Sequence, residues 1–246
     1  LSYPDWIVEC LRADLGAERA EGALASMNGA ATAVARSDGY IQDPASQQVA
    51  EAVGVRAGER VLDLCAAPGG KATAMATSDG LVVAADLRPS RVRLIADNVA
   101  RLDLDGPVCA LAADGLAAPF AEGSFDRVLV DAPCSGLGSL RRRPDARWRI
   151  DADAPQRLAS LQRRLLESAA PLVRPGGTLS YSVCTMTVQE TTAVAEAFAQ
   201  AHERWAIVPA PEGDWVPWGT GALLLPQATQ SDGMAWFGWQ RPEGES

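Results

Sequence analysis

Residues 61–75 read VLDLCAAPGGKATAM, and this stretch decides the fold. Its first four residues have the character of a short buried strand, Gly69 and Gly70 predict a tight turn, and a helix is expected from about Lys71. Glycines allow a ligand to approach the backbone closely, and the free N–H groups at a helix start attract polar atoms. The stretch therefore predicts a strand, loop and helix that bind a ligand.

The same alternation of strand and helix continues outward from this stretch and predicts βαβ units with a largely parallel sheet. Further strands are expected at 81–86, 108–112, 125–131 and 178–182, and helices at 44–53, 89–102, 155–173 and 188–203. Strand-like pieces near 207–208, 223–225 and 234–239 predict antiparallel edge strands. Residues 3–27 predict one or two amphipathic helices, and 28–42 a linker.

Two familiar phosphate-binding motifs fail in the glycine loop. A P-loop requires glycine where Cys65 stands and Ser or Thr where Ala72 stands, and G-x-G-x-x-G is not present either. The ligand that remains possible for this loop is a nucleoside-type cofactor without a pyrophosphate. Asp86, Asp114 and Asp131 come at the ends of three successive predicted strands, at the edge where α/β sheets bind ligands. We expect Asp86 to hold ribose hydroxyls and Asp114 an adenine amino group.

Composition excludes several classes of protein. The 246 residues are 48% hydrophobic, which is enough for the core of one α/β domain, and the formal net charge of −9 argues against non-specific coating of nucleic acid. Five cysteines without a C-x-x-C pair predict neither a disulfide framework nor a metal site. Long apolar runs are absent from the sequence, so we expect a cytoplasmic protein without a membrane span.

Two cysteines stand where predicted strands end. Cys134 follows the strand at 125–131, and Cys184 follows the strand at 178–182. Because these strands are expected to be neighbours, both thiols should face the cofactor crevice. Shortly after Cys134, residues 140–149 read LRRRPDARWR, a basic and aromatic segment in an acidic chain. Arginine pairs with phosphate and an indole stacks on a base, so the segment predicts RNA contact through Arg141, Arg142, Arg143, Arg147 and Trp148.

From about residue 39 to 241 the chain resembles the Sun/Fmu (RsmB-like) S-adenosylmethionine-dependent RNA cytosine-5 methyltransferases, on the loop LCAAPGGK at 64–71, DAPCSG at 131–136 and YSVCT at 181–185. The resemblance implies a Rossmann-like methyltransferase fold with a mostly parallel seven-stranded sheet, helices on both faces and a small N-terminal helical appendage. It implies a loop around the methionine end of the cofactor, formed by Cys65, Ala66, Ala67, Pro68, Gly69, Gly70 and Lys71. It also implies contacts from Asp86, Asp114 and Asp131 to the ribose, the base and the sulfonium region.

The chemistry of cytosine explains why such an enzyme needs a cysteine. Carbon 5 becomes nucleophilic only after a thiolate has added to carbon 6, which is covalent catalysis. The resemblance implies that Cys184 is this nucleophile, and that Cys134 helps to remove the proton and release the product. Asp131 is expected to hydrogen-bond the amino group or N3 of the cytosine. Where the family usually has Thr-Cys-Ser, this chain has Val183-Cys184-Thr185.

The chain departs from the family near its N-terminus. Relatives carry a small RNA-binding subdomain between the first helices and the helix near residue 44, whereas here only some fifteen residues, 28–42, connect them. We therefore expect residues 1–37 to be a helical segment and linker, the remnant of a shortened subdomain. Residues 38–246 should form the methyltransferase domain. The alternative is that a segment is omitted from this sequence.

Three functions remain open at this point. The first is RNA cytosine-5 methylation by a monomer that needs no metal, with small-subunit ribosomal RNA as the leading substrate and transfer RNA as the second. The same chemistry on DNA would make Cys134 the nucleophile. A ribosome assembly factor that binds RNA and cofactor without turnover would need neither cysteine.

Overall fold

The computed structural model describes residues 2–31, 34–77 and 79–244. A single sheet of nine strands runs through these residues, in the order β3-β2-β1-β4-β5-β9-β8-β7, with β6 paired to β9. The strands are β1 (Arg60–Asp63), β2 (Leu81–Asp86), β3 (Val108–Ala112), β4 (Phe125–Asp131), β5 (Val173–Val183), β6 (Ala206–Ile207), β7 (Val216–Trp218), β8 (Gly221–Leu224) and β9 (Met234–Gln240).

The sheet has a parallel part and an antiparallel part. Strands β1 to β5 pair in parallel, as predicted, whereas β6 to β9 pair only antiparallel. The prediction of seven strands was wrong, because the two-residue β6 and three-residue β7 add to the sheet. Strand β5 also begins at Val173 and not near 178, since Phe125 of β4 pairs with Val173 before the register shifts. The predicted antiparallel edge is confirmed.

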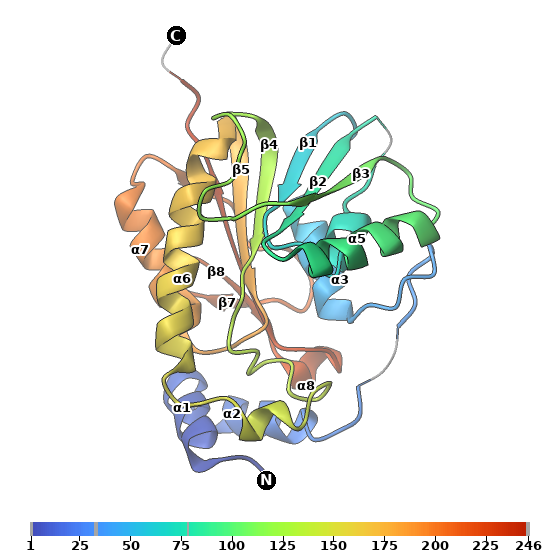
Figure 1. Ribbon diagram of the computed structural model, residues 1–246. Coiled ribbons are helices and arrows are strands. Elements are labelled where there is room, and N and C mark those ends of the chain that lie inside the picture. The colour runs from blue at the N-terminus through green and yellow to red at the C-terminus, as the bar shows by residue number, and fades with distance from the viewer. Residues whose placement is uncertain (1, 32–33, 78, 245–246) are drawn as a thin grey trace.

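Helices cover both faces of the sheet, as the sequence predicted. Figure 1 shows α6 and α7 on one side and α3 and α5 on the other. The α-helices are α1 (Asp5–Leu15), α2 (Ala17–Ser26), α3 (Pro44–Val53), α4 (Gly70–Ala74), α5 (Pro89–Arg101), α6 (Ala154–Ala169), α7 (Thr192–Ala201) and α8 (Pro226–Thr229). Three short 3-10 helices are η1 (Ala146–Trp148), η2 (Ala170–Leu172) and η3 (Val188–Glu190). The helix expected over 188–203 is therefore η3 followed by α7.

Local sequence explains why α3 begins and ends where it does. The side chain of Asp43 accepts a hydrogen bond from the Ala45 N–H at 2.9 Å, and Pro44 stands at the first helical position. Gly54 ends the helix with a left-handed φ of 65°. Val49 and Val53 are buried, and they lie on the face of α3 that packs against the sheet.

Two hydrophobic clusters stabilise the two faces. The larger one joins α6, α7 and the sheet to the N-terminal helices, so Ile7, Leu11 and Leu24 are fully buried in it. The smaller one holds α3 and Ile95 of α5 against the other face. Residues 32 and 33 of the predicted linker lie outside the described residues.

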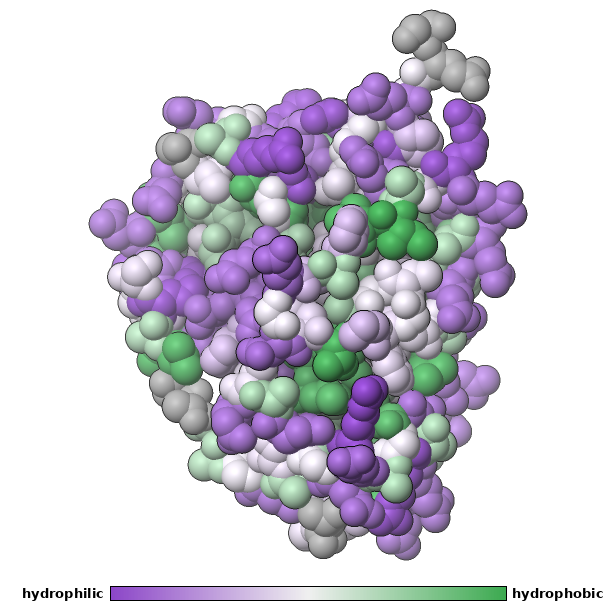
Figure 2. Space-filling view, turned by 180° about the vertical axis from the view of Figure 1, so that it is seen from behind, coloured by the Kyte–Doolittle hydropathy of each residue, from purple (hydrophilic) through white to green (hydrophobic). Residues whose placement is uncertain are grey.

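On the face seen in Figure 2, hydrophilic side chains surround smaller apolar areas. None of the described helices combines the length and the apolar character that crossing a membrane requires.

Candidate active site

The carboxyl ends of β1, β4 and β5 open into a cavity of about 660 Å³, where the two predicted catalytic cysteines meet the glycine loop. A volume of about 300–1,000 Å³ is usual for small-molecule sites. The structure brings most of the predicted residues to this cavity. Those that line it are Cys65, Ala66, Ala67, Pro68, Gly70, Lys71, Asp131, Cys134, Arg142, Arg143 and Cys184.

The glycine loop after β1 is held by its neighbours. Its Ala66 N–H donates to the Ala85 carbonyl at 2.8 Å, and the Ala67 carbonyl accepts from Arg91 at 2.7 Å. Gly69 has a left-handed φ of 105°, and a Cβ there would lie 3.3 Å from Ile95 of α5. Only glycine meets both requirements without strain. The loop is thus fixed with its backbone along the cavity wall.

Asp86 and Asp114 do not line this cavity. Asp86 is buried at the end of β2, where its carboxylate accepts hydrogen bonds from the Ala67 and Arg88 N–H groups at 3.3 and 3.2 Å. Asp114 is exposed, and its carboxylate accepts from the Leu116 N–H at 2.9 Å. Their contacts with a cofactor remain predictions.

The two thiols are in contact. The Sγ atoms of Cys134 and Cys184 are 3.3 Å apart, because the cysteines follow the adjacent parallel strands β4 and β5, in which Asp131 is paired with Ser182. The Ser139 hydroxyl lies 3.7 Å from the Cys184 sulfur. The loop after β4 also closes over Cys184, since the Gly138 N–H donates to the Cys184 carbonyl at 3.0 Å.

The surroundings shift the pKa values of the two thiols in opposite directions. The hydrogen bond with Cys134 lowers the pKa of Cys184 against the opposing effects of burial and the Asp131 charge, and Ser139 and the charge of Lys71 lower it further. The same hydrogen bond, followed by burial, raises the pKa of Cys134 well above its ordinary value. A thiolate is the nucleophilic form of cysteine, so Cys184 is the better nucleophile of the two. Burial raises the pKa of Cys65, which makes that thiol the least suited to attack.

Lys71 and Asp131 form an ion pair at the same place. Their Nζ and Oδ2 atoms are 2.7 Å apart, and the lysine side chain is only 10% exposed. Burial alone would lower the pKa of Lys71, but the Asp131 carboxylate outweighs burial and the pKa is raised. The ammonium group therefore stays charged and stabilises a thiolate at Cys184.

The arginine-rich segment divides into buried and exposed residues, and here the sequence prediction was partly wrong. Arg141 is buried and donates to the Ser231 carbonyl at 3.1 Å. Arg147 is also buried, donates to the Ser2 carbonyl at 2.8 Å and lies over the Tyr3 ring. Both side chains hold distant segments of the chain together and are not available to RNA.

Three of the five predicted RNA contacts remain accessible. Arg142 and Arg143 are exposed and line the cavity, and Trp148 is 62% exposed. Arg142 also pairs with the fully buried carboxylate of Asp232 in the turn before β9. RNA contact by these three side chains remains a prediction.

Sequence reasoning missed several residues of the site. Tyr40, Ile41 and Gln42 line the cavity ahead of α3, and Ser139 approaches Cys184. Glu190, which is fully buried behind the two cysteine loops, was also missed. No local pattern marks these residues, because their neighbours come from distant parts of the chain.

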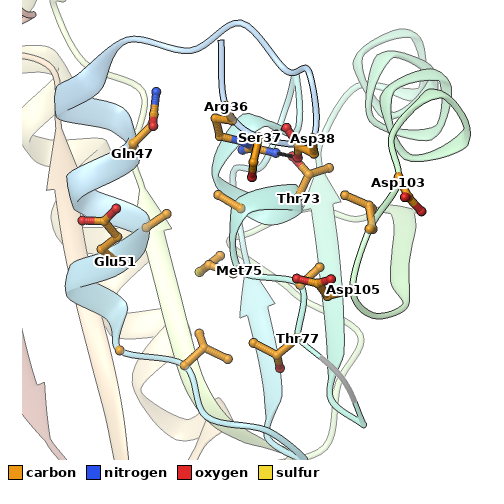
Figure 3. Close-up of a pocket in the computed structure, with 16 residues that line it drawn as sticks. Arg36, Ser37, Asp38, Gln47, Glu51, Thr73, Met75, Thr77, Asp103 and Asp105 are labelled. Atoms are coloured by element: carbon orange, nitrogen blue, oxygen red, sulfur yellow. Dashed lines mark hydrogen bonds and ion pairs between the residues drawn. The ribbon is translucent and has the colours of Figure 1, made fainter. Parts of the chain in front are cut away.

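A second cavity of about 600 Å³ lies beside α3 and α4. Figure 3 shows Gln47 and Glu51 on one side and Asp103 and Asp105 on the other. At its edge Arg36 pairs with Asp38 and donates to the Thr73 hydroxyl at 3.0 Å. Among the described residues that line it, none carries a thiol or is a lysine.

Strand order, the glycine loop and the position of the cavity together define the class of protein. They are those of a Rossmann-like, S-adenosylmethionine-dependent methyltransferase. The crystal structure of a methyltransferase homologue from Pyrococcus horikoshii has a TM-score of 0.63 and 26% identity, covering 82% of this chain and 68% of that one. The crystal structure of PH0851 has a TM-score of 0.87 and 26% identity, covering 97% of this chain and 66% of that one.

Within this class, the chain belongs to the family 16S rRNA methyltransferase RsmB/F, whose model matches residues 50–237. The resemblance stated from the sequence is thereby confirmed. A similar relative is the probable ribosomal RNA small subunit methyltransferase B of Bacillus subtilis (strain 168), 44% identical over 167 residues. That match covers 66% of this chain and 37% of the relative, so the chain spans well under half of the relative's length.

Proposed function

We propose that this chain transfers a methyl group from S-adenosylmethionine to carbon 5 of a cytosine in small-subunit ribosomal RNA. The observation that carries the proposal is the contact of two thiols, with Sγ atoms 3.3 Å apart, beside the Lys71–Asp131 ion pair at the ends of neighbouring parallel strands. Binding alone needs no such pair, and transfer to a more reactive atom needs no thiolate. Family membership and the name of the Bacillus relative support the choice of RNA.

The cavity fits the cofactor that the family implies. Residues 65–68, 70 and 71 form part of its wall, and a Cβ on Gly70 would meet the Tyr40 ring at 3.0 Å, so this part of the wall has no room for a side chain. We assign this wall to the methionine end of the cofactor, with Asp86 and Asp114 as its proposed partners beyond the cavity. When bound, S-adenosylmethionine supplies an electrophilic methyl group.

Cys184 begins the reaction on the RNA base. Its thiolate adds to carbon 6 of the cytosine, forming a carbon–sulfur bond and moving the electron pair of the 5,6 double bond towards carbon 5 and the ring. Asp131 accepts a hydrogen bond from the cytosine amino group, and Lys71 holds Asp131 in place. Carbon 5 is thereby made nucleophilic enough to take the methyl group.

Cys134 ends the reaction. Carbon 5 now carries both a hydrogen and the methyl group. Cys134 assists the removal of that hydrogen as a proton, which passes to solvent, so the double bond is restored and Cys184 leaves as a thiolate. The net change replaces one proton of cytosine by a methyl group and leaves S-adenosylhomocysteine. Cys134 lies 3.3 Å from Cys184, so it is placed at the bond that must break.

The base must leave a helix to reach this cavity, because carbon 6 of a stacked base is not accessible. Arg142 and Arg143 at the cavity, with Trp148 nearby in the chain, are the proposed contacts to phosphate and base. We further propose that residues 1–37 are the remnant of an RNA-binding subdomain beside a methyltransferase domain over 38–246, and that the protein works in the cytoplasm.

Methyl transfer to defined RNA tests this function. The protein is incubated with methyl-labelled S-adenosylmethionine and unmodified transcripts of small-subunit ribosomal RNA, with transfer RNA and single-stranded DNA in parallel. The labelled nucleosides are then identified by mass spectrometry. 5-Methylcytidine in ribosomal RNA supports the proposal. Label found only in transfer RNA or only in DNA would identify that nucleic acid as the substrate instead. Cofactor binding without methyl transfer to any of the three would indicate a protein that binds RNA and cofactor without catalysis.

A further inference from the structure

Behind the two cysteine loops lies a carboxylate that the proposed chemistry does not use. Glu190 is fully buried in η3, and its side chain accepts four hydrogen bonds. The donors are the Ser135 N–H at 2.8 Å, the Ser135 hydroxyl, Gln162 Nε2 at 3.1 Å and the Thr187 hydroxyl at 3.2 Å. A buried carboxylate is costly unless it is satisfied in this way.

These contacts hold Cys134 from both sides. Ser135, the residue after Cys134, donates twice to Glu190. Pro133, the residue before it, accepts a hydrogen bond at 2.9 Å from Gln162, which also donates to Glu190. The backbone on either side of Cys134 is therefore tied to one charged group.

The same network reaches the loop that carries Cys184. The hydroxyls of Ser135 and Thr185, the residues that follow the two cysteines, lie 3.1 Å apart. Tyr181, three residues before Cys184, donates its hydroxyl to the Glu190 carbonyl at 2.6 Å. Glu190 thus contacts both loops that must be aligned for the thiols to meet.

The turn that carries Glu190 is itself fixed by the N-terminal helices. The Val188 N–H donates to Asp14 of α1 at 2.8 Å. Asp14 is anchored by Leu11 and Leu15, which are buried in the larger core. The position of Glu190 is therefore set by the fold.

We propose that Glu190 is a positioning residue of the methyl-transfer reaction, which holds Cys134 against Cys184 through Ser135 and Gln162. The effect expected on turnover rests on the proposed function. The effect expected on the alkylation of the two thiols does not depend on that function. The negative charge of Glu190 also adds to the raised pKa of Cys134, after the hydrogen bond to Cys184 and burial. Glu190 thereby disfavours the thiolate of Cys134 before substrate binds, when Cys184 carries the charge.

The first test needs no RNA. Wild type, Glu190→Gln and the exposed control Glu167→Gln are alkylated with iodoacetamide over a range of pH, and peptides carrying residues 134 and 184 are quantified by mass spectrometry. Glu190→Gln is expected to shift the alkylation of Cys134 to lower pH, because a nearby negative charge is lost. The control should match wild type. Unchanged profiles of both cysteines in Glu190→Gln would overturn the inference.

The second test uses turnover. Glu190→Gln is expected to lower kcat roughly 10- to 100-fold through misplacement of Cys134, with KM for RNA changed less than about threefold. A covalent protein–RNA adduct should accumulate, because release is the step that needs Cys134. A rise in KM with unchanged kcat would contradict a positioning role. If wild type itself transfers no methyl group, the proposed function fails while the alkylation result still decides the role of Glu190.

A second variant guards against loss of folding. If Glu190→Gln has no cooperative thermal transition, Ser135→Ala removes the hydroxyl bridge next to Cys134 and leaves Gln162 on Glu190. It is expected to change Cys134 alkylation and adduct accumulation in the same direction, with a smaller loss of kcat. Wild-type behaviour of a folded Ser135→Ala in both measurements would contradict the inference.

Discussion

Two cavities of similar size, about 660 and 600 Å³, lie on either side of α4 and differ in the groups that line them. Gly70 and Lys71 of α4 face the first, together with two thiols and Asp131 at the ends of parallel strands. Thr73 and Ala74 face the second, which carries carboxylates from α3 and the loop before β3 (Figure 3). Size therefore does not distinguish an active site, whereas a nucleophile beside an ion pair at strand ends does.

Removing the proposed nucleophile should have the largest effect. Cys184→Ala is expected to lower methyl transfer by about 10³-fold or more, because the covalent route is lost. Single-turnover transfer of labelled methyl to RNA measures this. The exposed Cys109→Ala serves as the matched control and should behave as wild type. Substantial activity in Cys184→Ala would assign the nucleophile to another residue.

Neutralising the lysine of the first cavity should have the next largest effect. Lys71→Met removes the positive charge that lowers the pKa of Cys184 and leaves Asp131 without its partner. We expect methyl transfer to fall roughly 10- to 100-fold at neutral pH, and the pH–rate profile to move to higher pH. An unchanged profile would show that Lys71 does not act on the thiol.

Filling the space over Cys184 tests the packing of the first cavity. A Cβ on Gly138 would lie 2.1 Å from the Gly233 carbonyl oxygen and 3.1 Å from that of Cys184. Gly138→Ala should therefore destabilise the fold by about 1–3 kcal/mol, as measured by urea unfolding. Gly244→Ala, where a Cβ meets nothing within 4 Å, should leave the unfolding free energy unchanged.

A buried acid near the first cavity should make stability depend on pH. Burial, and then the charge of Asp131, raise the pKa of Asp63 from 3.8 to about 8. Because the folded state holds this proton more tightly, the contribution of Asp63 to stability is fully present below about pH 4 and is lost as the pH rises through 8. The loss on going from pH 5 to 8 should be smaller in Asp63→Asn, by on the order of a few kcal/mol. Equal losses in both proteins would contradict the assignment.

Altering the second cavity should have the smallest effect. Glu51→Gln and Asp105→Asn change carboxylates that contact neither thiol, so methyl transfer should stay within about twofold of wild type. The measurement is the same single-turnover assay that is used for Cys184→Ala. A large loss in either variant would mean that both cavities serve the reaction.

The sequence predicted the parts of the molecule that local patterns encode. The glycine loop at 64–71, strands β2, β3 and β4, and the N-cap at Asp43 followed from spacing and residue type. The cavity's cysteines followed from their places after neighbouring strands. These features depend on residues close together in the chain.

The remainder depended on partners far apart in the chain. Arg141 and Arg147 looked like RNA contacts, but carbonyls of Ser231 and Ser2 hold them in the interior, and charge alone gives no indication of burial. Glu190 falls within the helix expected over 188–203 and had no predicted role, yet it is satisfied by Ser135 and Gln162 from other elements. The three-residue β7 was too short to show strand periodicity, whereas the two-residue β6 overlaps the strand-like piece predicted near 207–208.

The most direct test of the central claim is to trap the covalent intermediate. Cys134→Ala is incubated with S-adenosylmethionine and RNA, digested with protease and nuclease, and the adduct is located by mass spectrometry. We predict a methylated cytosine attached to Cys184, in greater amount than in wild type, because release is blocked. An adduct on another cysteine, or methylated RNA formed at the wild-type rate without any adduct, would contradict the account.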